Sequence, residues 1–220
     1  MSVAAQGVLL ESLSFAALPL TTLLSFALTS LLIELTPGPN MAYLAVVAAG
    51  EGRKPGLATV AGVALGLALL GLAAAVGLAE LISQSRPVYE VLRWAGVLFL
   101  LYLAFDAWRD AALDDAPRDR SSLSYFRRGL VTNLLNPKAA LFFITVLPAF
   151  VDPAGPLLTQ NVALVAVYVA VATAVHAAIV VLAAAFEPIL TDPERERRVR
   201  RVLSLLLAAV ALWFAWSTRM

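Results

Sequence analysis

Two short proline-containing segments carry the polar groups from which this chain could build a solute site. The first, inside a long apolar stretch, reads Thr36-Pro37-Gly38-Pro39-Asn40. Proline has no N–H, so a helix loses hydrogen bonds here, and the carbonyls of Ile33 and Leu35 are left without their donors. A helix that starts near Asn40 exposes N–H groups at its positive end. The segment therefore offers partners for both ends of a zwitterion.

The second segment reads Asn133-Leu134-Leu135-Asn136-Pro137-Lys138. Pro137 frees the carbonyl of Asn133 in the same way, and two amides and an ammonium lie beside it at membrane depth. Proline kinks are also tolerated in membrane helices when neighbouring groups satisfy the backbone, so a purely structural kink stays open for either segment. We predict one substrate site from both segments, made by Glu34, Pro37, Gly38, Pro39, Asn40, Asn133, Asn136, Pro137 and Lys138.

Glu34 and Lys138 are the charged members of this set. A carboxylate inside a membrane span is costly and usually faces a cavity or a partner, and Lys138 is its natural opposite. Glu34 would receive a substrate ammonium or titrate as the proton site, and Lys138 would receive a substrate carboxylate. A static ion pair between the two is the alternative, and either reading places them close together.

Each uncharged polar candidate could have either a transport role or a structural role. Asn40, Asn133 and Asn136 could line the cavity, since amides both donate and accept, or they could join helices to one another. His176 is the only histidine. Its imidazole titrates near neutral pH, which makes it a second proton-coupling candidate beside Glu34, while a hydrogen-bonded helix contact is the simpler reading.

The elements that position these residues are membrane helices. Of 220 residues 61% are hydrophobic and 14% charged, with a mean hydropathy of +0.85, which is too apolar for one soluble core of this size. We expect an all-α polytopic protein, a single transporter domain over 1–220 with about six transmembrane helices. The expected spans are 19–49, 57–81, 88–107, 129–151, 157–186 and 202–217, with charged turns at 108–128 and 187–201.

The basic residues predict the orientation of these spans. Twelve of the 16 lysines and arginines follow the first, third and fifth spans, and three lie on the opposite side. Cytoplasmic loops retain positive charge, so both termini are predicted to be extracytoplasmic. We expect the first hydrophobic segment to stay as an anchor. Three spans per half, with a break in the first and fourth, further predict a 3+3 inverted repeat with halves 19–108 and 126–217.

Beside the two proline segments, the chain has four further short motifs, Gly52-Arg53-Lys54-Pro55-Gly56, Gly62-Val63-Ala64-Leu65-Gly66, Phe126-Arg127-Arg128-Gly129 and Pro148-Ala149-Phe150-Val151. Together these motifs resemble those of the LysE/RhtB translocator family. The resemblance covers most of residues 28–151, and beyond 152 only the hydropathy agrees. It implies a six-helix bacterial exporter of basic amino acids, threonine, homoserine or homoserine lactone, driven by the proton or the membrane potential. Leu67 departs from the pattern, because many relatives have an acidic or amide residue there.

We therefore predict a secondary transporter that exports amino acids or their derivatives across the bacterial inner membrane, with a small cation carrier or channel as the alternative. The absence of cysteine excludes a thiol relay across the membrane and a thiolate metal site. We expect no enzyme activity, no cofactor and no metal. The predicted partners are a small zwitterionic or cationic substrate and membrane lipids, with a homodimer left open and no nucleic acid.

Overall fold

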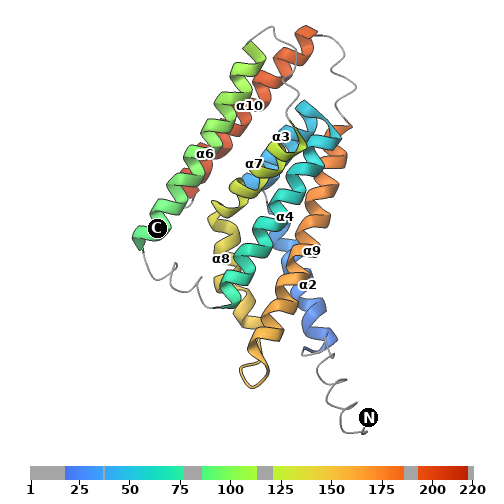
Figure 1. Ribbon diagram of the computed structural model, residues 1–220, viewed down its shortest axis with the longest axis vertical. Helices are drawn as coiled ribbons and strands as arrows, with labels where there is room; N and C mark the ends of the chain where they lie inside the picture. Colours follow the sequence, from blue (N-terminus) through green and yellow to red (C-terminus); the bar gives the residue numbers. More distant parts are fainter. Residues whose placement is uncertain (1–17, 37, 77–85, 113–120, 186–192, 218–220) are drawn as a thin grey trace.

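The computed structural model describes residues 18–36, 38–76, 86–112, 121–185 and 193–217, and helices make up most of them (Figure 1). Among these described residues there is no β-strand, so the all-α prediction is confirmed. The elements are α2 (Leu20–Glu34), α3 (Pro39–Glu51), α4 (Arg53–Ala75), α6 (Arg86–Ala112), α7 (Ser122–Leu134), α8 (Pro137–Thr145), the 3-10 turn η1 (Leu147–Phe150), α9 (Leu157–Ala184) and α10 (Pro193–Ser217).

Both predicted breaks are present. Helix α2 ends at Glu34, α3 begins at Pro39, and the two axes bend by 65°. Helix α7 ends at Leu134, and the segment that follows the second break is bent from it by 51°. Pro39 and Pro137 each stand at the first position of a new helix, where a missing N–H costs nothing. Pro37 lies outside the described residues.

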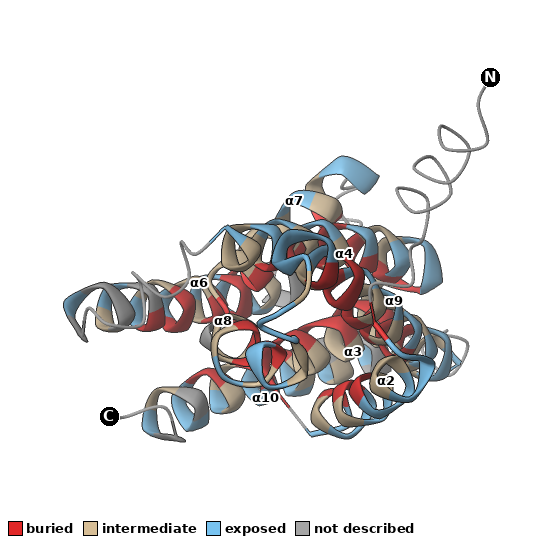
Figure 2. Ribbon diagram, turned by 90° about the horizontal axis from the view of Figure 1, so that it is seen from below, coloured by how far each residue is buried: buried red, intermediate tan, exposed pale blue. Residues whose placement is uncertain are grey.

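The number of spans is only partly settled by the helices. Within the described ranges, α4 and α9 are each long and apolar enough to cross a membrane, and the two bent pairs bring the total to four. That α6 and α10 are further spans, and that the halves form a 3+3 inverted repeat, stay predictions. Exposed positions lie along the outward faces of the helices (Figure 2). Many of the exposed residues are leucines, which suits contact with lipid.

Two glycines let α4 and α7 approach closely. A Cβ on Gly62 would lie 2.0 Å from the carbonyl oxygen of Phe126, and one on Gly129 would lie 2.3 Å from that of Thr59. Contacts this short leave no room for any other residue. The sequence motif around Gly62 therefore serves helix packing, as small residues commonly do in membrane helices.

Helices α6 and α10 run side by side and lean away from the other helices (Figure 1). The buried guanidinium of Arg93 on α6 joins them by donating to the carbonyl of Ala215 near the end of α10. Through α10 the pair packs against α3. Both helices are longer than the predicted spans 88–107 and 202–217. Helix α6 continues to Ala112, and α10 begins at Pro193. Most of the expected turn at 187–201 is thus helix, which corrects that prediction.

Candidate functional site

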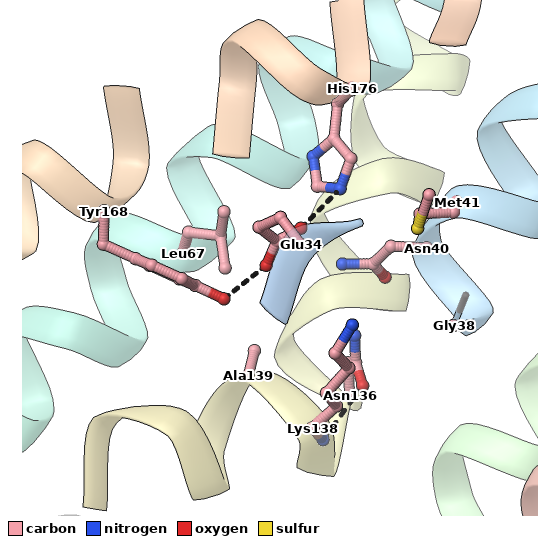
Figure 3. A pocket seen from close by; sticks show the side chains of 10 residues that line it. All are labelled: Glu34, Gly38, Asn40, Met41, Leu67, Asn136, Lys138, Ala139, Tyr168 and His176. Atoms are coloured by element: carbon pink, nitrogen blue, oxygen red, sulfur yellow. Dashed lines mark hydrogen bonds and ion pairs between the residues drawn. The ribbon is translucent and has the colours of Figure 1, made fainter. Parts of the chain in front are cut away.

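A small pocket with polar walls lies where the two helix breaks meet (Figure 3). Its walls come from α2, α3, α4, α8 and α9 and from the breaks themselves. The free space between the side chains holds about one water molecule. A larger solute therefore requires the helices to separate. The polar side chains of the wall are those of Glu34, Asn40, Asn136, Lys138, Tyr168 and His176.

The ammonium of Lys138 is bound to the first break. Its Nζ donates to the carbonyl oxygens of Ile33 at 2.9 Å and Thr36 at 2.7 Å. These carbonyls lie at the C-terminal, negative end of α2, which favours a cation. The stem of Lys138 passes Gly38, where a Cβ would be 3.5 Å from Cδ. One side chain of the second break thus satisfies backbone groups that the first break exposes.

Glu34 has different partners from the one we predicted. Its Oε1 accepts a hydrogen bond from the Tyr168 hydroxyl at 2.5 Å, and its Oε2 lies 3.2 Å from Nε2 of His176. Both partners are on α9. The latter distance is that of an ion pair, although neither ring nitrogen of His176 makes a well-aligned hydrogen bond. A protonated His176 would therefore neutralise a carboxylate that is only 6% exposed.

The direct ion pair between Glu34 and Lys138 is not formed, which corrects that alternative. Both side chains line the same pocket, yet among the described residues the ion pair of Glu34 is with His176. The reason is competition. Carbonyls freed by a broken helix attract an ammonium in a site without bulk water, and Lys138 reaches them.

The asparagines divide between two roles. Asn40 donates from Nδ2 to Oδ1 of Asn133 at 2.7 Å, which ties the start of α3 to α7. The remaining Oδ1 of Asn40 and Nδ2 of Asn133 are buried with no hydrogen-bond partner. Asn136 lines the pocket and caps α8, because its Oδ1 accepts the backbone N–H of Lys138 at 3.1 Å. Asn133 stands behind Asn40, where Gly66 leaves space for its amide.

The proline and glycine candidates shape the two breaks. Pro39 is buried at the start of α3, Gly38 lines the pocket, and Pro137 begins α8. The carbonyl of Asn133, which we expected Pro137 to leave free, accepts the N–H of Asn136 at 2.9 Å. The carbonyl of Ile33, which we also expected to be free, accepts the N–H of Thr36 at 3.1 Å. Each break therefore satisfies one of these carbonyls within its own turn, and Lys138 adds a donor to Ile33 and to Thr36 in the first break.

Tyr168 lines the pocket and bonds to Glu34, and the sequence analysis missed it. It is fully buried, and its ring stacks on Phe142 with centroids 3.9 Å apart. Phe26 packs against Phe142, and Phe150 packs edge-on against Phe26, so aromatic rings close this side of the pocket. Leu67 adds an apolar wall. The available signal was a hydroxyl-bearing side chain in the middle of a long apolar span.

Comparison with known proteins gives a consistent picture. The family model described as LysE type translocator matches residues 31–218. The homoserine/homoserine lactone efflux protein of Salmonella typhimurium is 32% identical over 139 residues, which cover 62% of this chain and 68% of that protein. The leucine efflux protein of Salmonella choleraesuis is 31% identical over 137 residues, or 60% of this chain and 64% of that one. No solved structure matches.

Proposed function

The chain belongs to the LysE type translocator family, and from this premise we propose that it exports a small amino acid or amino-acid derivative across the bacterial inner membrane. One observation carries the proposal. A carboxylate and an ammonium line a single small pocket at the point where two interrupted helices meet. Opposite charges in one pocket suit a zwitterion, and the relatives named for homoserine, homoserine lactone and leucine efflux support this substrate class.

Each charged side chain of the pocket would bind the substrate group of opposite charge. The substrate ammonium would approach Glu34, whose carboxylate has lone pairs beyond those used by Tyr168. The substrate carboxylate would approach Lys138, because an ammonium has three donors and two serve the carbonyls of the first break. The amides of Asn40 and Asn136 would orient the substrate between them. Export then consists of binding and release, with no bond broken.

Glu34 and His176 form the proposed proton-coupling pair. They lie 3.2 Å apart inside a pocket with little water. When both side chains are charged, the imidazolium of His176 neutralises the Glu34 carboxylate. A substrate ammonium must then compete with His176 for this carboxylate. Loss of the proton from His176 leaves the carboxylate free to bind the substrate. The protonated imidazole of His176 and the substrate ammonium would thus pair with the Glu34 carboxylate in alternation, which is the requirement for exchange.

A cation carrier or channel is the second candidate, and the position of Lys138 argues against it. The backbone carbonyls of Ile33 and Thr36 are the oxygen ligands that a metal cation would use. The ammonium of Lys138 already occupies them and repels further cations. Lipid contact of the outer faces and a homodimer remain proposals beside the main one.

We further propose six spans with both termini outside the cytoplasm. The proposal rests on the arginines that follow α3, α6 and α9 in the sequence. A reporter enzyme that works only in the cytoplasm is expected to be active when fused after residue 116. A matched fusion after residue 155, between η1 and α9, is expected to be inactive. Activity of the second fusion alone would reverse the orientation.

The exporter proposal is tested by efflux from loaded membrane vesicles. Vesicles that contain the purified protein are filled with leucine, homoserine, threonine, lysine or glutamate, and the loss of each solute is followed with time. We expect at least one zwitterionic amino acid to leave faster than from protein-free vesicles, and glutamate to leave no faster. Equal rates for every solute with and without the protein would contradict the proposal.

A further inference from the structure

A second, partly open pocket lies further along α3, between α3, α6, α7 and α10, and the free space between its side chains holds a few water molecules, more than the central pocket holds. We call it the vestibule. Its apolar wall includes Val46, Val47, Leu103 and Leu207, of which all but Val46 are buried. It is lined by none of the residues that line the central pocket. The two cavities are therefore separate in this closed form.

The vestibule contains both signs of charge. The Glu51 carboxylate lies at the end of α3 and accepts a hydrogen bond from the Tyr125 hydroxyl at 3.0 Å. The guanidinium of Arg128, on α7, donates to Asp106 at 2.7 Å. A guanidinium has five N–H donors, so Arg128 can hold a second carboxylate while it keeps Asp106. A carboxylate likewise accepts more than one donor, so Glu51 can receive an ammonium beside Tyr125.

The vestibule and the central pocket share two helices. Asn40 on α3 lines the central pocket, and Glu51 at the other end of the same helix lines the vestibule. Eleven residues separate them, about 16 Å along a helix. On α7, Arg128 lines the vestibule, and Asn133, one and a half turns later, bonds to Asn40. The end of α3 at Glu51 is the one predicted to face the cytoplasm, since Arg53 and Lys54 follow it.

We propose that the vestibule binds an amino acid with an aliphatic side chain and is the first of two sites that the substrate occupies on its way out. This inference rests on the proposed export function. Glu51 and Tyr125 would take the substrate ammonium, Arg128 would take the carboxylate, and the valine and leucine wall would take the side chain. Separation of α3 from α7 at the Asn40 to Asn133 bond would then join the two cavities.

Gly50 allows the vestibule to be filled without disturbing the helices. A Cβ at this position meets only Cδ1 of Leu203 at 3.7 Å, which is an ordinary contact. Gly50→Ala therefore leaves the cavity nearly unchanged, whereas Gly50→Leu places three more carbons inside it. Alanine and leucine both favour helix over glycine, so neither change weakens α3. The two variants form a matched pair that differs only in the volume they occupy.

The test measures binding and transport on the same preparations. Equilibrium binding of radiolabelled leucine to the full chain in nanodiscs is expected to reach two molecules per chain for the wild type and Gly50→Ala, and one for Gly50→Leu. In efflux assays Gly50→Leu is expected to raise the KM by about tenfold, the effect of losing one good contact, with the maximal rate changed less. Glu51→Gln should raise the KM in the same direction.

The outcomes separate this inference from the export function. If the wild type exports leucine and Gly50→Leu matches it in both KM and binding stoichiometry, the vestibule is not a substrate site and the exporter still stands. If the wild type exports nothing, the exporter proposal itself fails. If mass spectrometry finds a phospholipid held by the wild type and absent from Gly50→Leu, and one leucine bound to each, a lipid occupies the vestibule and the inference is overturned.

Discussion

Glu34→Gln is expected to reduce export at least tenfold while the protein stays folded. Glutamine has nearly the same shape, and its amide oxygen can still accept the hydroxyl of Tyr168, which lies 2.5 Å from Glu34. The negative charge that faces His176 and would receive the substrate ammonium is lost. A hydrogen bond to a charged group contributes about 1.5–3 kcal/mol, which corresponds to roughly 10- to 150-fold in binding. The measurement is the initial rate of efflux from loaded vesicles.

Tyr168→Phe is the matched control for this prediction. It removes one donor from Glu34 and keeps both the carboxylate and the aromatic ring that stacks on Phe142. We expect a smaller loss of export than for Glu34→Gln, because the negative charge that would bind the substrate ammonium stays in place. Wild-type export by Glu34→Gln, in protein that elutes normally from a sizing column, would show that this carboxylate does not receive the substrate.

Lys138→Met is expected to impair both stability and export. The methionine removes the donor from the carbonyls of Ile33 and Thr36, and it removes the only lysine from the pocket wall. Ile33 keeps the N–H of Thr36 as a donor, so the carbonyl of Thr36 loses most. An acceptor left unsatisfied away from water costs about 1–3 kcal/mol. For a chain of this size each kcal/mol lowers the melting temperature by about 2–4 °C. We expect a melting temperature about 2–12 °C below that of the wild type in detergent, together with loss of export.

Two further variants serve as controls for Lys138→Met: Lys138→Arg, and a double variant in which Glu34 and Lys138 exchange places. Arginine keeps the positive charge and several donors, so most of the stability should return even if export does not. The exchange of Glu34 and Lys138 for one another should give no more folded protein than either single change, because each has its own partners. Rescue by the exchange would mean that the two side chains pair directly in the membrane.

The positions of both helix breaks could be predicted from proline chemistry alone. Pro39 and Pro137 cannot supply a backbone N–H, and the helices do end and restart next to them. The same reasoning identified Glu34 and Lys138, since charged groups inside apolar runs are rare and costly. These residues do line one pocket. Local sequence was sufficient because both signals arise from single residues in an otherwise apolar context.

The partners of the charged residues could not be predicted in this way. His176 and Tyr168 belong to α9, and their approach to Glu34 depends on how α9 packs against α2, which no local pattern records. Opposite charge suggested Lys138 as the partner of Glu34. That choice overlooked the exposed carbonyls as competitors for the ammonium, although the break that exposes them had been predicted.

The predicted start of α10 was also wrong. The predicted span began at 202, where the arginine-rich run ends, whereas the helix begins at Pro193. Hydropathy marks where lipid contact becomes favourable, and a helix is ended by its caps and breakers. Pro193 at the first helical position is such a signal. The charged residues from 194 to 201 therefore extend the helix beyond the apolar segment.

The central claim is that solute passes through the polar space between the two breaks, and a single introduced cysteine tests it most directly. The chain has no cysteine of its own, so a thiol at Ala139, which is 3% exposed and lines the pocket, reports on that space alone. A thiol at Leu28, 58% exposed on the outer face of α2, is the control. We predict that a small charged thiol reagent labels Ala139→Cys, that an exported amino acid slows this labelling, and that Leu28→Cys stays unlabelled within lipid. Labelling of Ala139→Cys at a rate that no exported amino acid alters would contradict the account.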